Sequence, residues 1–225
     1  MIEIAIPIFD RLTALDAIGP YEVLSRLPGA QVRFVARDAG PVRTDNGMLG
    51  VSANLSLREA PPPDVVVVPG GLGSRRELAQ EETLDWLRSS HERTRFTTSV
   101  CTGSLILGAA GILDGLEATT HWLSLEKLAE FGARPVRRRV VEAGKVITAA
   151  GVSAGIDMAL LLAARIAGDT AAQAIQLGIE YDPQPPFGAG SPDTAPPAIV
   201  ERLRSLSSGA ADRSARPRTP IPGPP

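Results

Sequence analysis

Short runs of Val and Ile alternate along the chain with longer segments of helical period. This alternation is typical of strand–helix–strand units arranged around a mostly parallel sheet. The run Val65–Val68 is apolar at every position, which predicts a central strand buried on both faces. Strands are predicted over residues 2–9, 31–36, 64–68 and 96–100. The pattern therefore predicts an α/β fold in which a parallel central sheet has helices on both faces.

Helical periods and two hairpin signals fill the intervals between these strands. The segment 41–57 alternates irregularly and contains Asn46-Gly47, a pair suited to a type I′ turn, which predicts a β-hairpin at the sheet edge. A second hairpin is predicted over 136–149, with its tip at Ala143-Gly144. Helices are predicted over residues 19–27, 75–92, 102–111 and 123–131, from 153 onward, over 170–181 and over 198–206.

The chain has 225 residues, of which 44% are hydrophobic, enough apolar material for one core. The composition changes near the C-terminus, because 11 of the 20 prolines follow Asp182. We therefore expect a single α/β domain over residues 1–206 and a Pro-rich, disordered tail over residues 207–225.

Charge and targeting signals exclude several classes of protein. Lys and Arg number 23 against 25 Asp and Glu, and this near balance argues against a basic nucleic-acid face. No apolar run approaches the ~20 residues that a membrane helix needs, and the start MIEIAIPIFD has no basic leader region, so we expect a cytoplasmic protein. The single cysteine excludes an internal disulfide and any cysteine-based metal cage.

That cysteine, Cys101, falls where the strand 96–100 must turn into a helix. A thiol at a helix N-terminus lies near unpaired amides and the positive end of the helix dipole, which favours the thiolate. The neighbouring amides of such an elbow also form an oxyanion site. The alternative is that Cys101 is a small buried hydrophobic residue, as cysteines often are.

Asp16 is the candidate partner for the thiol. It interrupts an apolar stretch after the first strand, so it can lie beside Cys101 at the carboxyl edge of the sheet. A carboxyl group there would hold its proton more strongly than in water. The alternative is that Asp16 caps a helix beginning near Gly19-Pro20. The histidines are weaker candidates: His91 is expected on a solvated surface, and His121 either reaches the site or packs beside Trp122.

Other polar features of the sequence have a structural interpretation as well as a functional one. Gly70-Gly71-Leu72-Gly73 leaves its backbone amides open for an oxyanion, or forms only a tight turn. Asp157 suits the start of a helix, and Arg137-Arg138-Arg139 is interpreted as a solvated face.

Several motifs together resemble the DJ-1/PfpI superfamily: Pro69-Gly70-Gly71, Ser99–Ser104 around the cysteine, and Ala118–Trp122. Within it, the chain resembles the bacterial isonitrile (isocyanide) hydratases. That resemblance rests on Leu15-Asp16 before Gly19-Pro20, VCTGSLILGAAG around Cys101, GVSAGID at 151–157, and EYDPQPPFGAGSPDTAP from Glu180. The likeness covers about residues 1–206.

The resemblance implies a flavodoxin-like sandwich with a nucleophile elbow, assembled as a homodimer. It implies Cys101 as the nucleophile and Asp16 as its acidic partner, with Thr102 and the Gly71 amide polarising or positioning a small substrate. The implied reaction hydrates an isonitrile with water to an N-substituted formamide, with no metal, no cofactor and no nucleic-acid or membrane partner.

Departures from family patterns leave other functions open. Cys101 is followed by Thr102 where the peptidase-like branch has histidine, which disfavours proteolysis. Asp16 stands where the DJ-1 and glyoxalase-like branches carry glutamate, which speaks mildly against a glyoxalase or deglycase. The motifs also resemble the sensor domain of AraC-type regulators, yet the Pro-rich residues after 206 are too few for a DNA-binding domain. Oxidation sensing by Cys101 is a further alternative.

Overall fold

The computed structural model describes residues 1–213. The chain divides into two compact units, the first Met1–Tyr181 and the second beginning at Asp182. The expected domain, by contrast, runs to residue 206. Residues 182–196, rich in Pro and Gly, contain no helix or strand, which explains a division at this point. The assignment of residues 1–206 to one domain stays a prediction.

The first unit is built on a seven-stranded sheet with the order β10-β11-β7-β6-β1-β2-β5. Every neighbouring pair is parallel except β10 and β11, so the predicted mostly parallel sheet is confirmed. The strands of this sheet are β1 (Ile2–Pro7), β2 (Ala30–Ala36), β5 (Leu55–Ser56), β6 (Val65–Val68), β7 (Phe96–Val100), β10 (Val140–Ala143) and β11 (Val146–Ala149).

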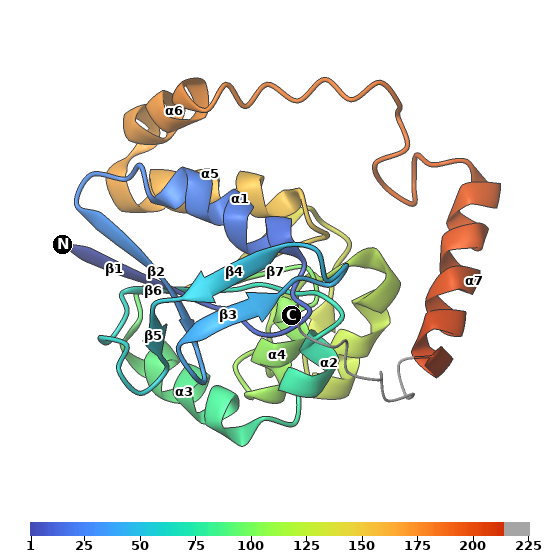
Figure 1. Cartoon of the computed structure of the whole chain (residues 1–225). Helices are drawn as coiled ribbons and strands as arrows, with labels where there is room; N and C mark the ends of the chain where they lie inside the picture. The colour runs from blue at the N-terminus through green and yellow to red at the C-terminus, as the bar shows by residue number, and fades with distance from the viewer. Residues whose placement is uncertain (214–225) are drawn as a thin grey trace, which may run out of the picture. The chain divides into compact units, whose positions relative to one another are not determined.

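Helices cover both faces of the sheet. In Figure 1, α1 and α5 lie on one side of it, and α2, α3 and α4 lie on the other. The helices of this unit are α1 (Ala14–Leu24), α2 (Ser74–Glu77), α3 (Glu81–Arg93), α4 (Gly103–Ala109), α5 (Ala154–Ala167) and α6 (Asp169–Gly178), together with a 3₁₀ helix, η1 (Trp122–Phe131). The arrangement is the expected flavodoxin-like sandwich.

Close packing of α1 against α5 closes the core on one face. A Cβ at Gly19 would lie 3.1 Å from Ile156 Cγ1, and one at Gly155 would lie 3.0 Å from both methyl carbons of Val100. The four valines of β6 are at most 1% exposed, as the unbroken apolar run predicts. Gly19 therefore lets α1 approach α5, and Gly155 lets α5 approach both β7 and Pro20 of α1.

The hairpins form with different details from those expected. The strands β3 (Gly40–Arg43) and β4 (Gly50–Ala53) pair with each other outside the main sheet, and their turn is a six-residue loop, 44–49. Asn46 does not have the positive φ that a type I′ turn requires there, while Gly47 has φ 79°. The 136–149 region does contain the β10–β11 hairpin, and β8 (Glu117–Ala118) pairs with β9 (Arg134–Pro135).

Several helix boundaries also differ from the expected ones. α1 begins at Ala14 and contains Pro20, so it starts before Asp16 instead of after it. The helix predicted over 75–92 is broken into α2 and α3, because Gln80 adopts a non-helical conformation. In the second unit α7 (Pro197–Arg213) continues past Leu206, where the tail was expected to begin. The rest of the expected tail, 214–225, lies outside the described residues. Within residues 1–213 no helix is long and apolar enough to span a membrane.

Candidate active site

The order of the sheet strands sets the position of the site. The chain runs from β1 to β2 on one side of β1 and then returns to β6 on the other side, which makes a topological switch point at β1 and β6. Ligands of such sheets bind outside the carboxyl ends of the strands at this point. Asp16 follows β1, Gly70 and Gly71 follow β6, and Cys101 follows β7, so all of them lie at that edge.

The backbone of Cys101 forms a strained elbow. Its φ is +57°, a left-handed conformation that non-glycine residues seldom adopt and that tends to persist at functional sites. The Cys101 amide donates to the carbonyl oxygens of Ala149 (3.1 Å) and Ala150 (3.0 Å). Its carbonyl oxygen accepts hydrogen bonds from the hydroxyls of Thr120 (2.8 Å) and Ser104 (3.1 Å). These contacts hold the elbow between β11 and the segment before η1.

The thiol of Cys101 is buried, and the residue is only 5% exposed. Burial, followed by the negative charge of Asp16, raises its pKa to about 12, although the Thr102 and Val152 amides and the Thr102 side chain lower it. Burial therefore opposes the preference for the thiolate that the position of Cys101 at a helix N-terminus predicts. α4 is only seven residues long, and its N-terminus does not outweigh the loss of water around the sulfur.

Asp16 lies in the first turn of α1 and is fully buried. Its Oδ2 accepts a hydrogen bond from the Gly70 amide (3.0 Å), while Oδ1 has no hydrogen-bond partner among the described residues. Burial raises the pKa of Asp16 to about 7, and the Gly70 amide and the Cys101 thiol oppose that rise. The raised pKa agrees with the sequence prediction. Asp16 does not cap its helix, because the N-cap position is occupied by Thr13.

Thr102 connects the cysteine to the glycine turn after β6. Its Oγ1 accepts a hydrogen bond from the Gly71 amide (2.9 Å) and lies 3.0 Å from the hydroxyl of Ser74, which donates to the Gly71 carbonyl (2.7 Å). Ser74 is 2% exposed and was not identified from the sequence, since nothing distinguishes it there from a helix-capping serine. These hydrogen bonds fix the position of the Thr102 hydroxyl beside the thiol.

The glycines after β6 are required by close packing, and their amides are not open to a ligand. The Gly70 amide donates to Asp16, the Gly71 amide to Thr102, and the Gly73 amide to the Arg11 carbonyl. A Cβ at Gly70 would lie 2.5 Å from the Thr102 nitrogen, and Gly71 has φ +130°. Of the two alternatives for this segment, the hydrogen bonds of the three glycine amides favour the tight turn, which packs directly on the elbow.

Val152 is a second strained residue at the site, and the sequence analysis missed it. Its φ is +40°, unusual for a β-branched residue, and such a conformation costs on the order of 1–3 kcal/mol. Its amide donates to the Cys101 sulfur. The only signal in the sequence is its place in the GVSAGID motif, where a valine gives no hint of its backbone conformation.

Neither histidine contacts the thiol directly. His121 packs its ring against Gly151, whose Cβ would lie 2.7 Å from His121 Cδ2, and its Nδ1 accepts from the Leu123 amide (3.3 Å). Burial lowers the pKa of His121. His91 is half-buried and hydrogen-bonded to the Thr97 hydroxyl (2.8 Å), so the expectation of a solvated His91 is wrong.

A polar cluster lies at the start of α5, close to Val152 in the chain. Asp157 is paired through Oδ2 with the Arg139 guanidinium, and its Oδ1 accepts from the Tyr181 hydroxyl (3.0 Å). The same guanidinium donates to the Ser153 hydroxyl (3.3 Å). Arg138 instead pairs with Glu117 (2.5 Å). These arginines are exposed, as the solvated face predicted for 137–139 requires, and the fold also brings acidic partners to Arg138 and Arg139 from other segments.

The part of the chain that the structure describes contains no group of three or more His, Cys, Asp or Glu side chains suited to a metal ion. A cavity of about 260 Å³ lies beside the carboxyl ends of β1 and β2, and neither Cys101 nor Asp16 lines it. The elbow itself brings together two titratable side chains, the Cys101 thiol, whose pKa is raised, and the Asp16 carboxyl group, whose pKa is about 7. Such a pair can add sulfur to an electrophile and move the proton.

The structure is therefore an α/β sandwich with Cys101 on an elbow at the carboxyl edge of its sheet and with a buried carboxyl group, Asp16, in its first helix. This combination defines the class of protein to which the chain is compared. Residues 2–165 match the DJ-1/PfpI family, and the chain belongs to that family.

The relatives of this chain include an enzyme and a transcriptional regulator. The chain is 46% identical to the isonitrile hydratase of Pseudomonas putida over 92% of its own length and 90% of that protein. It is 30% identical to the HTH-type transcriptional regulator CdhR of Pseudomonas aeruginosa over 72% of its own length and 49% of that protein. A ThiJ/PfpI family protein from Pseudomonas syringae superposes with a TM-score of 0.89 at 39% identity, covering 92% of this chain and 86% of that one.

Proposed function

We propose that this protein is an isonitrile hydratase that converts an isonitrile and water into an N-substituted formamide. The observation that carries the proposal is the pairing of the Cys101 thiol with a fully buried Asp16 carboxyl whose Oδ1 has no partner among the described residues. The P. putida isonitrile hydratase, similar along almost the whole chain, supports the same reaction.

In the first step, sulfur attacks the terminal carbon of R–N≡C. Asp16, as carboxylate, accepts the thiol proton as the carbon–sulfur bond forms, and then delivers that proton to the same carbon. The triple bond becomes a C=N double bond, and the product is a thioimidate, R–N=CH–S, on Cys101. A pKa of about 7 suits Asp16 to both roles near neutral pH.

In the second step, water adds to the thioimidate carbon while Asp16 accepts a proton from the water and passes one to nitrogen. The carbon–sulfur bond then breaks, sulfur regains its proton, and R–NH–CHO leaves. Atoms and electrons balance without an oxidant, a metal or a cofactor.

Two neighbouring groups assist this chemistry. The Thr102 and Val152 amides donate to the sulfur, so they stabilise negative charge as it develops there. The role of Gly71 is indirect, because its amide donates to Thr102 Oγ1 and orients that hydroxyl. Thr102 and Gly71 are thus proposed as substrate-positioning residues beside the catalytic pair.

The test is to measure formamide production by NMR when purified, reduced protein is mixed with a small alkyl isonitrile in H₂¹⁸O. We expect turnover with one ¹⁸O atom in the formamide, and no turnover by Cys101→Ser. An adduct on Cys101 whose added mass equals that of the isonitrile is expected when the reaction is stopped early.

The competing functions give different results in parallel assays. A glyoxalase or deglycase would consume methylglyoxal and leave isonitriles unchanged. A redox or ligand sensor would turn over neither compound. If folded wild-type protein with a reduced thiol produces no formamide, the hydratase proposal is rejected.

We propose a homodimer in the cytoplasm as the working form. The dimer is supported by the resemblance to the DJ-1/PfpI superfamily, and the cytoplasm by the need to keep a lone catalytic cysteine reduced. Sedimentation of the purified protein tests the dimer. The absence of a nucleic-acid partner stays a prediction.

A further inference from the structure

The segment 150–153 joins β11 to α5 and carries the Val152 amide that donates to the Cys101 sulfur. Ala150 is held at the elbow, since its carbonyl oxygen accepts from the Cys101 amide (3.0 Å). Val152 itself is strained, at φ +40°. A strained residue keeps its conformation only where its surroundings enforce it. The contacts at the two ends of the segment therefore decide whether the Val152 amide points at sulfur.

One residue, Arg139, contacts both ends of this segment. Its carbonyl oxygen accepts from the Ala150 amide (2.9 Å), and its guanidinium donates to the Ser153 hydroxyl (3.3 Å). The guanidinium also pairs with Asp157 in the first turn of α5. The planar guanidinium has several donors in a fixed geometry, so it can hold Ser153 and Asp157 at once.

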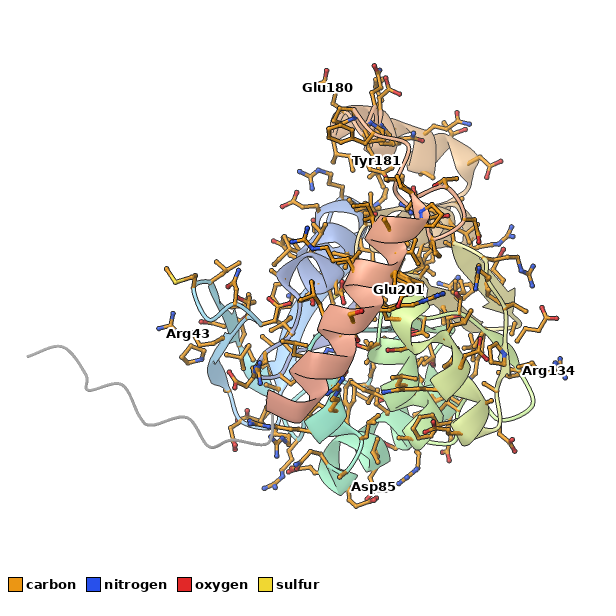
Figure 2. The ribbon with its side chains drawn as sticks, turned by 90° about the vertical axis from the view of Figure 1, so that its right-hand side faces the viewer. Arg43, Asp85, Arg134, Glu180, Tyr181 and Glu201 are labelled. Atoms are coloured by element: carbon orange, nitrogen blue, oxygen red, sulfur yellow. The ribbon has the colours of Figure 1, made fainter. Side chains whose placement is uncertain are left out.

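Asp157 is itself held by a second contact. Its Oδ1 accepts from the hydroxyl of Tyr181, the last residue of the first unit, which Figure 2 shows beside Glu180. The carboxylate is thus bound from two sides, which restricts the guanidinium that it pairs with.

We propose that Arg139 is a positioning residue for the reaction: through Ser153 and Asp157 it holds the 150–153 segment so that the Val152 amide donates to the Cys101 sulfur. This inference deepens the proposed function and rests on it for its effect on turnover. Arg139 does not touch the sulfur and is not a catalytic residue.

The matched pair of variants is Arg139→Ala and Arg138→Ala. The two residues are adjacent and both guanidinium groups are about half exposed, yet the guanidinium of Arg138 pairs with Glu117, which lies outside the segment 150–153. The measurement is the rate at which iodoacetamide alkylates Cys101, determined at several pH values that all lie below the pKa of the thiol. In this range the rate follows the thiolate fraction and needs no isonitrile.

We expect Arg139→Ala to raise the thiol pKa by about half a unit to one unit, which slows alkylation by about 3- to 10-fold at each pH. The kcat for an isonitrile should fall by a similar factor while KM changes by less than about twofold, because the lost hydrogen bond acts on developing charge. Arg138→Ala should match the wild type in both assays.

Arg139→Lys provides a second variant with its charge retained. A single ammonium group cannot donate to Ser153 and Asp157 in the same geometry, so we expect an intermediate slowing of alkylation. This variant keeps the test decisive if Arg139→Ala fails to fold.

The inference is overturned if the folded Arg139 variants have the same alkylation profile as the wild type and Arg138→Ala. This outcome does not depend on whether the protein hydrates isonitriles. A protein whose alkylation shifts as expected but which makes no formamide would refute the hydratase proposal alone.

Discussion

Asp16 and Asp157 both lie in the first turn of a helix, on two helices that pack together. Asp16 is fully buried, and one of its oxygens has no partner in the described part of the chain. The Asp157 side chain is 32% exposed and is bound by Arg139 and Tyr181. The comparison teaches that local helix position does not decide what a carboxylate does. Burial without a cation raises the pKa of Asp16 and suits it to carry a proton in the proposed reaction, while pairing with Arg139 and Tyr181 suits Asp157 to hold its surroundings in place.

The buried position of Asp16 also works against stability. A charge in a site of low polarity is unfavourable unless it is paired, and no basic side chain contributes to the pKa of Asp16. Active sites commonly retain such groups because the same desolvation gives the pKa that catalysis needs. The two aspartates should therefore respond to the same substitution in opposite ways.

The largest expected effect is on catalysis in Asp16→Asn. The amide keeps the shape of the side chain and its bond from Gly70, but it cannot carry a proton between sulfur, carbon and water. We expect kcat for isonitrile hydration to fall by about 10²- to 10⁴-fold. Formamide production measured by NMR checks this, with circular dichroism as the control for folding. Turnover within tenfold of the wild type would show that another group moves the proton.

The next effect is on stability as a function of pH. Folding raises the pKa of Asp16 from 3.8 to about 7, so between these values the folded protein holds a proton that the unfolded chain has released. Stability contributed by this group therefore falls as pH rises from about 4 to 7, by on the order of 4 kcal/mol, and is constant above.

Urea unfolding at pH 5 and pH 8 measures this dependence. Asp16→Asn should remove most of the loss and should be more stable than the wild type at pH 8, whereas Asp157→Asn should keep the wild-type dependence. An equal pH dependence in Asp16→Asn and the wild type would contradict the raised pKa.

A smaller effect is expected for Asp157→Asn. The substitution removes the charge that pairs with Arg139, and partly exposed ion pairs contribute about 0.2–1 kcal/mol to stability. We expect a free energy of unfolding lower by that amount, and alkylation of Cys101 slowed by about 2- to 5-fold as Arg139 loses its anchor. Unfolding in urea and the alkylation rate provide the two measurements. A gain in stability at pH 8, as for Asp16→Asn, would remove the distinction between the two aspartates.

The smallest effect is expected for Tyr181→Phe, which deletes only the hydroxyl that donates to Asp157. The ion pair with Arg139 remains, so alkylation of Cys101 should slow by less than about twofold, which corresponds to a hydrogen bond near the lower end of its usual range. A decrease larger than that of Asp157→Asn would mean that the Tyr181 ring, and not its hydroxyl, holds the cluster.

The site was predictable where local sequence signals coincide with sheet topology. The valine run of β6 and the strand before Cys101 are continuous apolar segments, and parallel strands bring their carboxyl ends to one edge, which placed Asp16 near the thiol. The raised pKa of Asp16 followed from its apolar neighbours in the chain.

The features that the sequence did not predict depend on contacts between segments that lie far apart in the sequence. The state of the thiol depends on how completely α1, the Gly70 turn and the 150–153 segment exclude water, which no local pattern encodes. The same holds for the Gly71 amide, which donates to Thr102 across 31 positions of sequence, and for Arg139, which reaches Asp157 across 18.

By itself the sequence determined the strands, the mostly parallel sheet, the position of Cys101 at the elbow and the resemblance to a family, because each of these depends on residue type and order. Tertiary structure alone decided the raised pKa of the thiol, the Asp16 oxygen without a partner in the described part of the chain, the strain at Val152 and the contacts of Arg139. The physical reason is that pKa values and backbone strain depend on solvent exclusion and on partners from other segments, and both arise only when the chain packs.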